Sequence, residues 1–258
     1  MSDIIGNTVQ AIKPLDRESM ALARARQDTL TKPTGSLGRL EEISVQLAGI
    51  QGNLLPQAAR KAVIVMVADH GVVAEGVSAY PQEVTAQMVL NFVKGGAAIN
   101  VISHQVGARV IVVDIGTAGD ISSFPGIIHA KISPGTRNMC QGPAMTFEEA
   151  ARSIETGIET VTNEIRKGLD IVATGEMGIG NTTASSAICA VMTGQSVRSV
   201  TGRGTGLGDQ QLSHKIEIIE KAISVNKPDA GKPLEVLARV GGLEIGGLAG
   251  VMLGAAAN

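Results

Sequence analysis

The stretch GEMGIGNTT, residues 175–183, places one carboxylate in a glycine-rich segment. A glycine turn that opens a helix supplies backbone N–H groups and a helix N-terminus, which together suit a phosphate. Glu176 is a poor neighbour for an anion unless the ligand also carries positive charge. The alternative for an isolated glycine loop is a tight strand-to-helix turn that binds nothing.

A second glycine-rich segment, GRGTGLG at residues 202–208, is followed by Lys215. Its glycines stand at every second position, which breaks the dinucleotide pattern G-x-G-x-x-G, and the phosphate-loop pattern GxxxxGK[ST] is absent. An NAD-dependent oxidoreductase is therefore disfavoured. Two glycine loops with a lysine after the second favour a phosphorylated ligand.

The segment VSAYPQEVTAQM, residues 77–88, holds the single tyrosine of the chain. One interpretation is a flat apolar pocket for an aromatic ring near Tyr80, with Ser78 and Gln87 as hydrogen-bonding groups. The other is a loop in which Pro81 precedes an ordinary helix.

Asp69-His70 could be metal ligands or an acid–base pair, but no histidine pattern typical of a metal site accompanies them. We expect His70 to pack a turn. No GxSxG elbow is present, and neither cysteine has an evident base beside it, so nucleophilic catalysis has no support.

Asp69-His70 and the GEMGIGNTT segment stand where predicted strands end. Apolar, β-branched runs predict strands at 61–69, 109–116, 126–133 and 169–175. Helical spacing predicts helices at 14–28, 39–52, 83–93, 95–107, 146–167, 184–192 and 209–224, with a broken helix to the end of the chain. Strands that alternate with helices predict an α/β fold with a mainly parallel sheet, whose ligands bind beyond the carboxyl ends of the strands.

The composition excludes several classes of function. A net charge of −2, 2% aromatic residues and no tryptophan argue against nucleic-acid binding. No apolar run reaches the roughly 18 residues of a membrane span, and no signal peptide is evident. With only Cys140 and Cys189, read as reduced thiols, we expect a cytoplasmic protein.

In order along the chain, TKPTGSLGRLE, ADHGVVAEGVSAYPQEVTAQM, DIGTAG, GTRNM, GEMGIGNTTASSA and GRGTGL resemble the nicotinate-nucleotide–dimethylbenzimidazole phosphoribosyltransferase family. The resemblance implies transfer of ribose 5-phosphate from nicotinate mononucleotide to 5,6-dimethylbenzimidazole, which gives α-ribazole 5′-phosphate and nicotinate. It also implies a Rossmann-like domain flanked by helices, a small helical subdomain, a homodimer, and neither metal nor other cofactor.

The resemblance also implies roles for individual residues. Ser78, Tyr80 and Gln87 would border the benzimidazole pocket. Glu176 would favour the positive charge that develops on the ribosyl carbon as nicotinate leaves. The expected contacts to the nucleotide come from the two glycine segments and the lysine that follows them: Gly178, Gly180, Asn181, Thr182, Gly202, Gly204, Gly206 and Lys215.

One departure limits the resemblance. In the family, LEIGGLAGVMLGAAAN is followed by a strand and a loop with a general-base glutamate, but this chain stops at Asn258. We expect the base to be absent and this truncated chain to be weakly active or inactive. The expected division is residues 1–38 as part of the helical subdomain and 39–258 as the Rossmann-like domain. The alternative function is a non-catalytic protein that binds a nucleotide or base.

Overall fold

The computed structural model describes residues 3–258, and its centre is a four-stranded sheet in the order β3-β2-β1-β4. The strands are β1 (Lys61–Ala68), β2 (Ala108–Gly116), β3 (Ile127–His129) and β4 (Ile171–Met177). β1 pairs in parallel with β2 and β4, and β2 pairs in parallel with β3. The predicted α/β fold with a mainly parallel sheet is confirmed.

The structure differs in several details from the predicted elements. β3 is shorter than the strand predicted at 126–133, and β4 runs to Met177, two residues past the predicted end. Helix α1 (Asp3–Ala11) was not predicted, because glycine, asparagine and threonine in its centre are weak helix formers. Its contacts with two long helices of the domain, α6 and α11, stabilise it instead.

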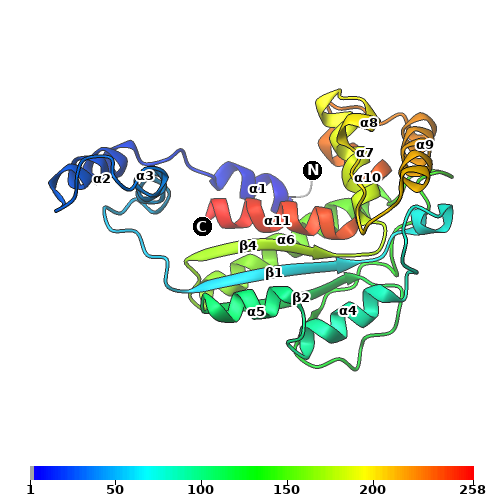
Figure 1. The fold of residues 1–258 in the computed structure, drawn as a ribbon, viewed down its shortest axis with the longest axis horizontal. Helices are drawn as coiled ribbons and strands as arrows, with labels where there is room; N and C mark the ends of the chain where they lie inside the picture. Colours follow the sequence, from blue (N-terminus) through cyan, green and yellow to red (C-terminus); the bar gives the residue numbers. More distant parts are fainter. Residues whose placement is uncertain (1–2) are drawn as a thin grey trace.

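Helices cover both faces of the sheet. Figure 1 shows α6 (Phe147–Arg166) and α11 (Leu243–Ala257) on one side, and α4 (Val84–Val93) and α5 (Ala98–Gln105) on the other. Alternate residues of β1 serve the two layers: Ile64 and Met66 pack toward α6 and α11, whereas Val63, Val65 and Val67 pack toward α4 and α5. Burial on both faces explains the continuous apolar run of β1.

Helices α6 and α11 pack with their backbones in close approach. A Cβ at Gly157 or Gly250 would overlap a backbone carbonyl oxygen of the facing helix, so neither position tolerates a side chain. The capping box predicted for α6 is also present, because Glu149 N–H donates to Thr146 Oγ1 and Thr146 N–H donates to Glu149 Oε2. The close packing fixes the start of α11 against the end of the sheet.

A further group of helices lies beside the carboxyl ends of the strands (Figure 1). It comprises α7 (Asn181–Thr193), α8 (Val197–Val200), α9 (Asp209–Asn226), α10 (Pro233–Val240) and the short 3-10 helix η1 (Gly71–Glu75). Their shared core contains Val72 and Val77 after β1, Ala187 of α7, Ile219 of α9 and Val240 of α10. This core holds the loops after β1 and β4 together.

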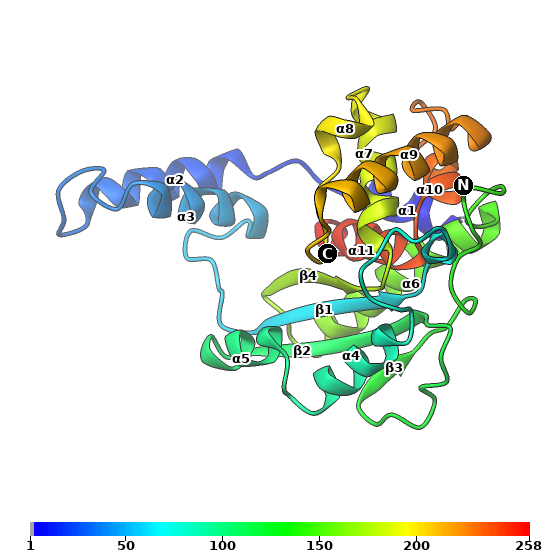
Figure 2. The same ribbon diagram turned by 45° about the vertical axis from the view of Figure 1, so that its right-hand side comes forward.

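Helices α2 (Arg17–Thr29) and α3 (Arg39–Gln51) form a hairpin that projects from the rest of the molecule (Figures 1 and 2). A small core of Ala23, Val45 and Ala48 joins the two helices. The expected boundary between residues 38 and 39 falls between α2 and α3, and that division stays a prediction. Within residues 3–258, no helix is both long and apolar enough to cross a membrane.

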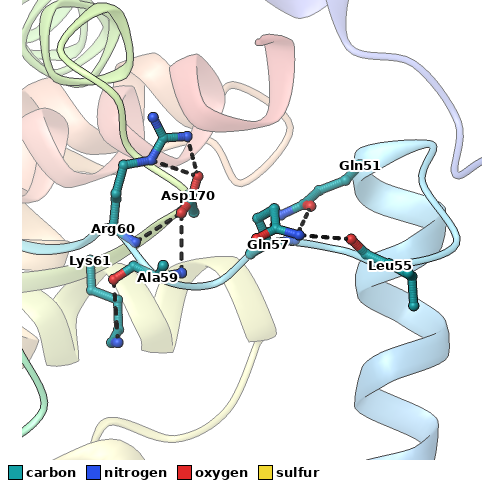
Figure 3. Close-up of polar contacts among 7 residues, drawn as sticks. All are labelled: Gln51, Leu55, Gln57, Ala59, Arg60, Lys61 and Asp170. Carbon is teal, nitrogen blue, oxygen red and sulfur yellow. Dashed lines mark hydrogen bonds and ion pairs between the residues drawn. The ribbon is translucent and has the colours of Figure 1, made fainter.

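The segment between α3 and β1 is fastened at both ends (Figure 3). At the hairpin end, the side chain of Gln51 bonds both backbone groups of Gln57 at 2.7 Å. At the sheet end, Asp170 accepts from the backbone N–H groups of Ala59 and Arg60 and from the guanidinium of Arg60. The hydrogen bonds from Arg60 lower the pKa of Asp170 to about 2.

Candidate active site

The carboxyl ends of β1, β2 and β4 carry the polar residues expected at the ligand-binding edge of a parallel sheet. Two buried aspartates there organise loops. Asp114 Oδ1 accepts from Gly116 N–H, Thr117 N–H and the Thr117 hydroxyl, at 3.2, 2.9 and 2.9 Å. Asp69 Oδ2 accepts from Ala118 N–H at 2.8 Å, and burial raises the pKa of Asp69. Both carboxylates therefore shape the rim of the site.

The turn Gly178–Gly180 delivers the N-terminus of α7 to the site. A Cβ at Gly178 would overlap the carbonyl oxygen of Ala68, and Gly180 has a φ of 93°, so both positions require glycine. Backbone groups of the first turn bond locally: Asn181 N–H donates to Gly178 O and Thr182 N–H donates to Asn181 Oδ1. The positive end of the helix still points at the site.

Lys215 is a buried cation that faces this helix end. Only 1% of its surface is exposed, and its Nζ donates to Thr182 Oγ1 at 2.7 Å. Burial lowers the pKa of Lys215, and among the described residues no carboxylate forms an ion pair with it. Such a charge is costly to bury unless an anion joins it. The side chain is thus placed to receive an anionic ligand.

These groups line one small pocket of about 30 Å³. The pocket is lined by Val77, Ser78, Gly178, Ile179, Gly180, Asn181, Thr182, Arg203, Gly204, Thr205, Leu207 and Lys215. The structure therefore brings together Ser78 and most of the residues expected to bind the nucleotide.

Other expected residues lie outside the pocket lining. Tyr80 is 51% exposed, and its backbone N–H donates to Ser78 Oγ. Gln87 is an exposed residue of α4. Gly202 and Gly206 belong to the loop before α9, where neither would meet a neighbour if it carried a Cβ. These four residues do not line the pocket.

Glu176 lies near the end of β4, whereas the sequence pattern placed it in a loop. The difference arises because β4 keeps pairing with β1, with Glu176 opposite Met66 and Met177 opposite Val67. The Glu176 side chain is exposed, and its Oε2 accepts from Asn181 Nδ2. Partial desolvation by the surrounding chain, and then the charge of Glu244, raise the pKa of Glu176.

Two buried residues complete the charged centre of the site. His70 and Glu244 are 1% and 0% exposed, and His70 Nε2 lies 2.9 Å from Glu244 Oε1. His70 therefore packs under the turn that follows β4, as predicted, but with a charged partner that the sequence did not indicate. The two residues are 174 positions apart, and only the fold brings them together.

Arg203 is another residue that the sequence pattern missed as a site residue. It stands inside the glycine segment GRGTGLG and lines the pocket, while its guanidinium bonds the carbonyl of Leu207 and the carboxylate of Asp209. Its position between two expected binding residues, Gly202 and Gly204, was a signal that could have identified it.

The arrangement suits a ligand with two different charges. Lys215, Arg203 and the N-terminus of α7 favour an anion, while Glu176 favours a cation. Asn181 links the two parts, because it bonds Glu176 and also lines the pocket. Within residues 3–258, no group of three or more histidine, cysteine, aspartate or glutamate side chains is arranged to hold a metal ion.

This chain is similar to known proteins over nearly its whole length. A family model described as a phosphoribosyltransferase matches residues 12–258. The nicotinate-nucleotide–dimethylbenzimidazole phosphoribosyltransferase of Dehalococcoides mccartyi is 57% identical over 256 residues, which are 99% of this chain and 73% of that protein. The enzyme of the same name from Roseiflexus sp. is 57% identical over 255 residues, 99% of this chain and 72% of that protein.

A solved structure shows the same fold. The crystal structure of CobT from Thermus thermophilus superimposes with a TM-score of 0.87 at 49% identity, over 92% of this chain and 71% of that one. Identity at this level over nearly the whole chain shows the family as well as the fold. This chain belongs to the nicotinate-nucleotide–dimethylbenzimidazole phosphoribosyltransferase family.

Proposed function

We propose that this chain transfers ribose 5-phosphate from nicotinate mononucleotide to 5,6-dimethylbenzimidazole. The products are α-ribazole 5′-phosphate and nicotinate. In this reaction the bond from the ribosyl carbon to the pyridinium nitrogen breaks, and its electron pair neutralises the ring. The unprotonated nitrogen of the benzimidazole forms the new bond to that carbon, and the other ring nitrogen then releases its proton to solvent water.

The observation that carries the proposal is the buried cation of Lys215 at the N-terminus of α7, which has no acidic partner among the described residues. A phosphate in the pocket would supply the missing negative charge and accept hydrogen bonds from Nζ and the Thr182 hydroxyl. The limited volume of the pocket fits this part of the ligand better than a whole nucleotide. The ribose and the ring would then extend outward, past Asn181.

Glu176 has the complementary role in the proposal. As nicotinate departs, the ribosyl carbon gains positive charge, which a carboxylate stabilises more strongly than it stabilises the ground state. The hydrogen bond from Asn181 Nδ2 would hold the carboxylate beside the ribose. Ser78, Tyr80 and Gln87 would border the benzimidazole pocket, with Ser78 also reaching the pocket that we assign to the phosphate.

The mode of assembly belongs to the same proposal. A homodimer is supported by apolar side chains that are exposed on the hairpin and on α5, among them Leu40 (64% exposed) and Ile102 (62% exposed). A cytoplasmic location is in keeping with the two free thiols, Cys140 and Cys189. Sedimentation equilibrium tests the dimer: a single species with the mass of one chain across the micromolar range would refute it.

The direct test is incubation of the protein with nicotinate mononucleotide and 5,6-dimethylbenzimidazole, followed by chromatography and mass detection of α-ribazole 5′-phosphate. Product that depends on both substrates supports the proposal. Calorimetric binding of both substrates with no product would instead favour the non-catalytic binding protein. The variant Lys215→Met serves as the control, because any product that it forms at the wild-type rate does not depend on the proposed phosphate site.

A further inference from the structure

The turn Gly178–Gly180 is anchored through its middle residue. Two of its three residues are glycines, which have the most backbone freedom of any residue and no side chain to hold them. Ile179 between them is buried, and its backbone N–H donates to Thr85 Oγ1 at 3.1 Å. Thr85 stands 94 positions earlier in the chain, in the first turn of α4. A side chain from a distant helix therefore holds the turn that delivers the N-terminus of α7.

Thr85 is a polar residue on the buried face of its helix. The buried residues of α4 are Thr85, Val89 and Phe92, which follow the spacing i, i+4, i+7 of one helix face. Thr85 has no exposed surface at all. Burying a hydroxyl costs free energy unless it is hydrogen-bonded, and valine would fill the same face without that cost. The hydroxyl therefore calls for an explanation beyond packing.

The hydroxyl of Thr85 also differs from that of a threonine with a local role. Threonine hydroxyls within helices commonly donate to a carbonyl of the preceding turn, as Thr160 of α6 does to Thr156 O at 2.7 Å. Thr85 Oγ1 instead accepts from the backbone of another element. Its contact thus serves the turn after β4 rather than α4 itself.

An acceptor for the hydroxyl proton lies nearby, at the end of β1. Asp69 is buried, and its Oδ2 accepts from Ala118 N–H at 2.8 Å. Burial raises the pKa of Asp69, whereas hydrogen-bonding groups around it lower that pKa, the Thr85 hydroxyl first among them. The hydroxyl of Thr85 therefore faces a donor, the Ile179 amide, and an acceptor, the Asp69 carboxylate.

The contact between Thr85 and Ile179 joins two parts of the site. Thr85 belongs to the segment 77–88, which also carries Ser78 and Gln87. Ile179 lines the small pocket together with Ser78, whereas Thr85 does not line it. The turn also rests on the end of β1, because a Cβ at Gly178 would overlap the carbonyl oxygen of Ala68. The place of the turn is thus set by close packing on one strand and by one hydrogen bond from α4.

We infer that Thr85 is a positioning residue, which fixes the turn Gly178–Gly180 through the Ile179 amide and joins it to the segment 77–88. The inference rests on the proposed function for the assignment of the turn to the phosphate and of the segment to the benzimidazole. Thr85 acts through the backbone of the turn, which in turn sets where the N-terminus of α7 meets the ligand.

The test compares Thr85→Val, which removes the hydroxyl, with Thr85→Ser, which keeps it. The probes are inorganic phosphate and then nicotinate mononucleotide, and calorimetry measures the Kd of each. In T85V we expect both Kd values to rise about tenfold, because the Ile179 amide loses its acceptor and the turn loses its anchor. T85S should bind within about twofold of wild type. Unchanged Kd values in folded T85V, or a T85S variant as weak as T85V, overturn the inference.

Thr160 supplies the matched control, because it is another buried threonine with one hydroxyl hydrogen bond and lies in α6, outside the pocket lining. T160V should lower the melting temperature and leave both Kd values unchanged. If T160V weakens binding as much as T85V does at an equal loss of melting temperature, Thr85 has only a structural role and the inference fails.

Hydrogen exchange of the Ile179 amide keeps the inference testable if T85V fails to fold. In the wild-type protein and in T85S, NMR should show this amide to be protected, and saturating inorganic phosphate should slow its exchange further. An Ile179 amide that exchanges as fast as in an unstructured peptide overturns the inference, as does one that phosphate leaves unchanged.

The same variants separate this inference from the proposed function. If T85V binds phosphate more weakly than T85S does while the wild type forms no α-ribazole 5′-phosphate, the positioning role stands and the proposed function fails. If the wild type forms product and T85V binds both probes normally, only the positioning role fails. If both hold, T85V should raise the KM for nicotinate mononucleotide more than it lowers kcat, and T85S should restore both.

Discussion

The two ends of β4 place carboxylates in opposite electrostatic situations. Asp170, just before the strand, accepts four hydrogen bonds from Ala59 and Arg60, and its pKa is lowered to about 2. Glu176, near the other end, has a raised pKa, owing to burial and to the charge of Glu244. The carboxylate just before β4 therefore forms an ion pair within the protein, whereas the carboxylate near the other end of the strand has no ion pair with a described residue.

The cations at the two ends differ in the same way. The hydrogen bond to Asp170 raises the pKa of Arg60, whereas burial lowers the pKa of Lys215, which lacks an acidic partner within residues 3–258. Internal pairing at the amino end contributes to the fold. At the carboxyl end, Glu176 and Lys215 form no ion pair with another described residue, which favours binding over stability. Four substitutions or conditions test this contrast.

The largest effect is expected for Lys215→Met. Loss of the buried cation should reduce kcat/KM by roughly 10²–10³, as expected from the cost of about 2–5 kcal/mol for truncating one partner of a buried charge pair. Because a buried unpaired charge opposes folding, the melting temperature should stay the same or rise. Steady-state kinetics and thermal denaturation measure the two effects. Lys221→Met, an exposed lysine of the same helix, should change neither.

Glu176→Gln should lower kcat by about 10²–10³, since preorganised charge at the reacting carbon is removed. The amide still accepts a hydrogen bond from Asn181, so nicotinate mononucleotide should bind with nearly unchanged affinity. Single-turnover kinetics and calorimetry separate the two quantities. A kcat within a few-fold of wild type would show that Glu176 does not stabilise the transition state.

Asp170→Asn is expected to affect stability and spare catalysis. The neutral amide of asparagine cannot form an ion pair with the Arg60 guanidinium. Its NH₂ group must also face N–H donors, because both oxygens of Asp170 accept hydrogen bonds from N–H groups. The melting temperature should fall modestly, because Arg60 is open to solvent and its ion pair is screened. Activity well below that temperature should match wild type. Reduced kcat in the folded variant would show that the two ends of β4 are coupled.

The smallest effect is a dependence of stability on pH. Asp170 has a folded-state pKa of about 2, below its ordinary value of 3.8, so the unfolded chain binds this proton more tightly. Its contribution is therefore complete above about pH 4 and is lost as the pH falls toward about 2. The difference in melting temperature between wild type and Asp170→Asn should shrink over that range. A constant difference would mean that the charge of Asp170 is unimportant.

Most of the secondary structure was predictable because its physical causes are local. The apolar run that forms β1 and the capping box of α6 are visible in short windows of sequence. Helix α1 was missed, because its stability comes from contacts with α6 and α11 rather than from its own residues. The end of β4 was misplaced for a similar reason, since Glu176 and Met177 are in the strand through pairing with β1.

The alternation of strands and helices, the two glycine segments and the family membership could all be read from the amino-acid sequence. They follow from local periodicity, from turn chemistry and from long shared segments. Which charges are paired depends instead on the three-dimensional fold. The fold buries Lys215 beside Thr182 and joins His70 to Glu244 across 174 residues, and ionisation depends on such neighbours rather than on residue type.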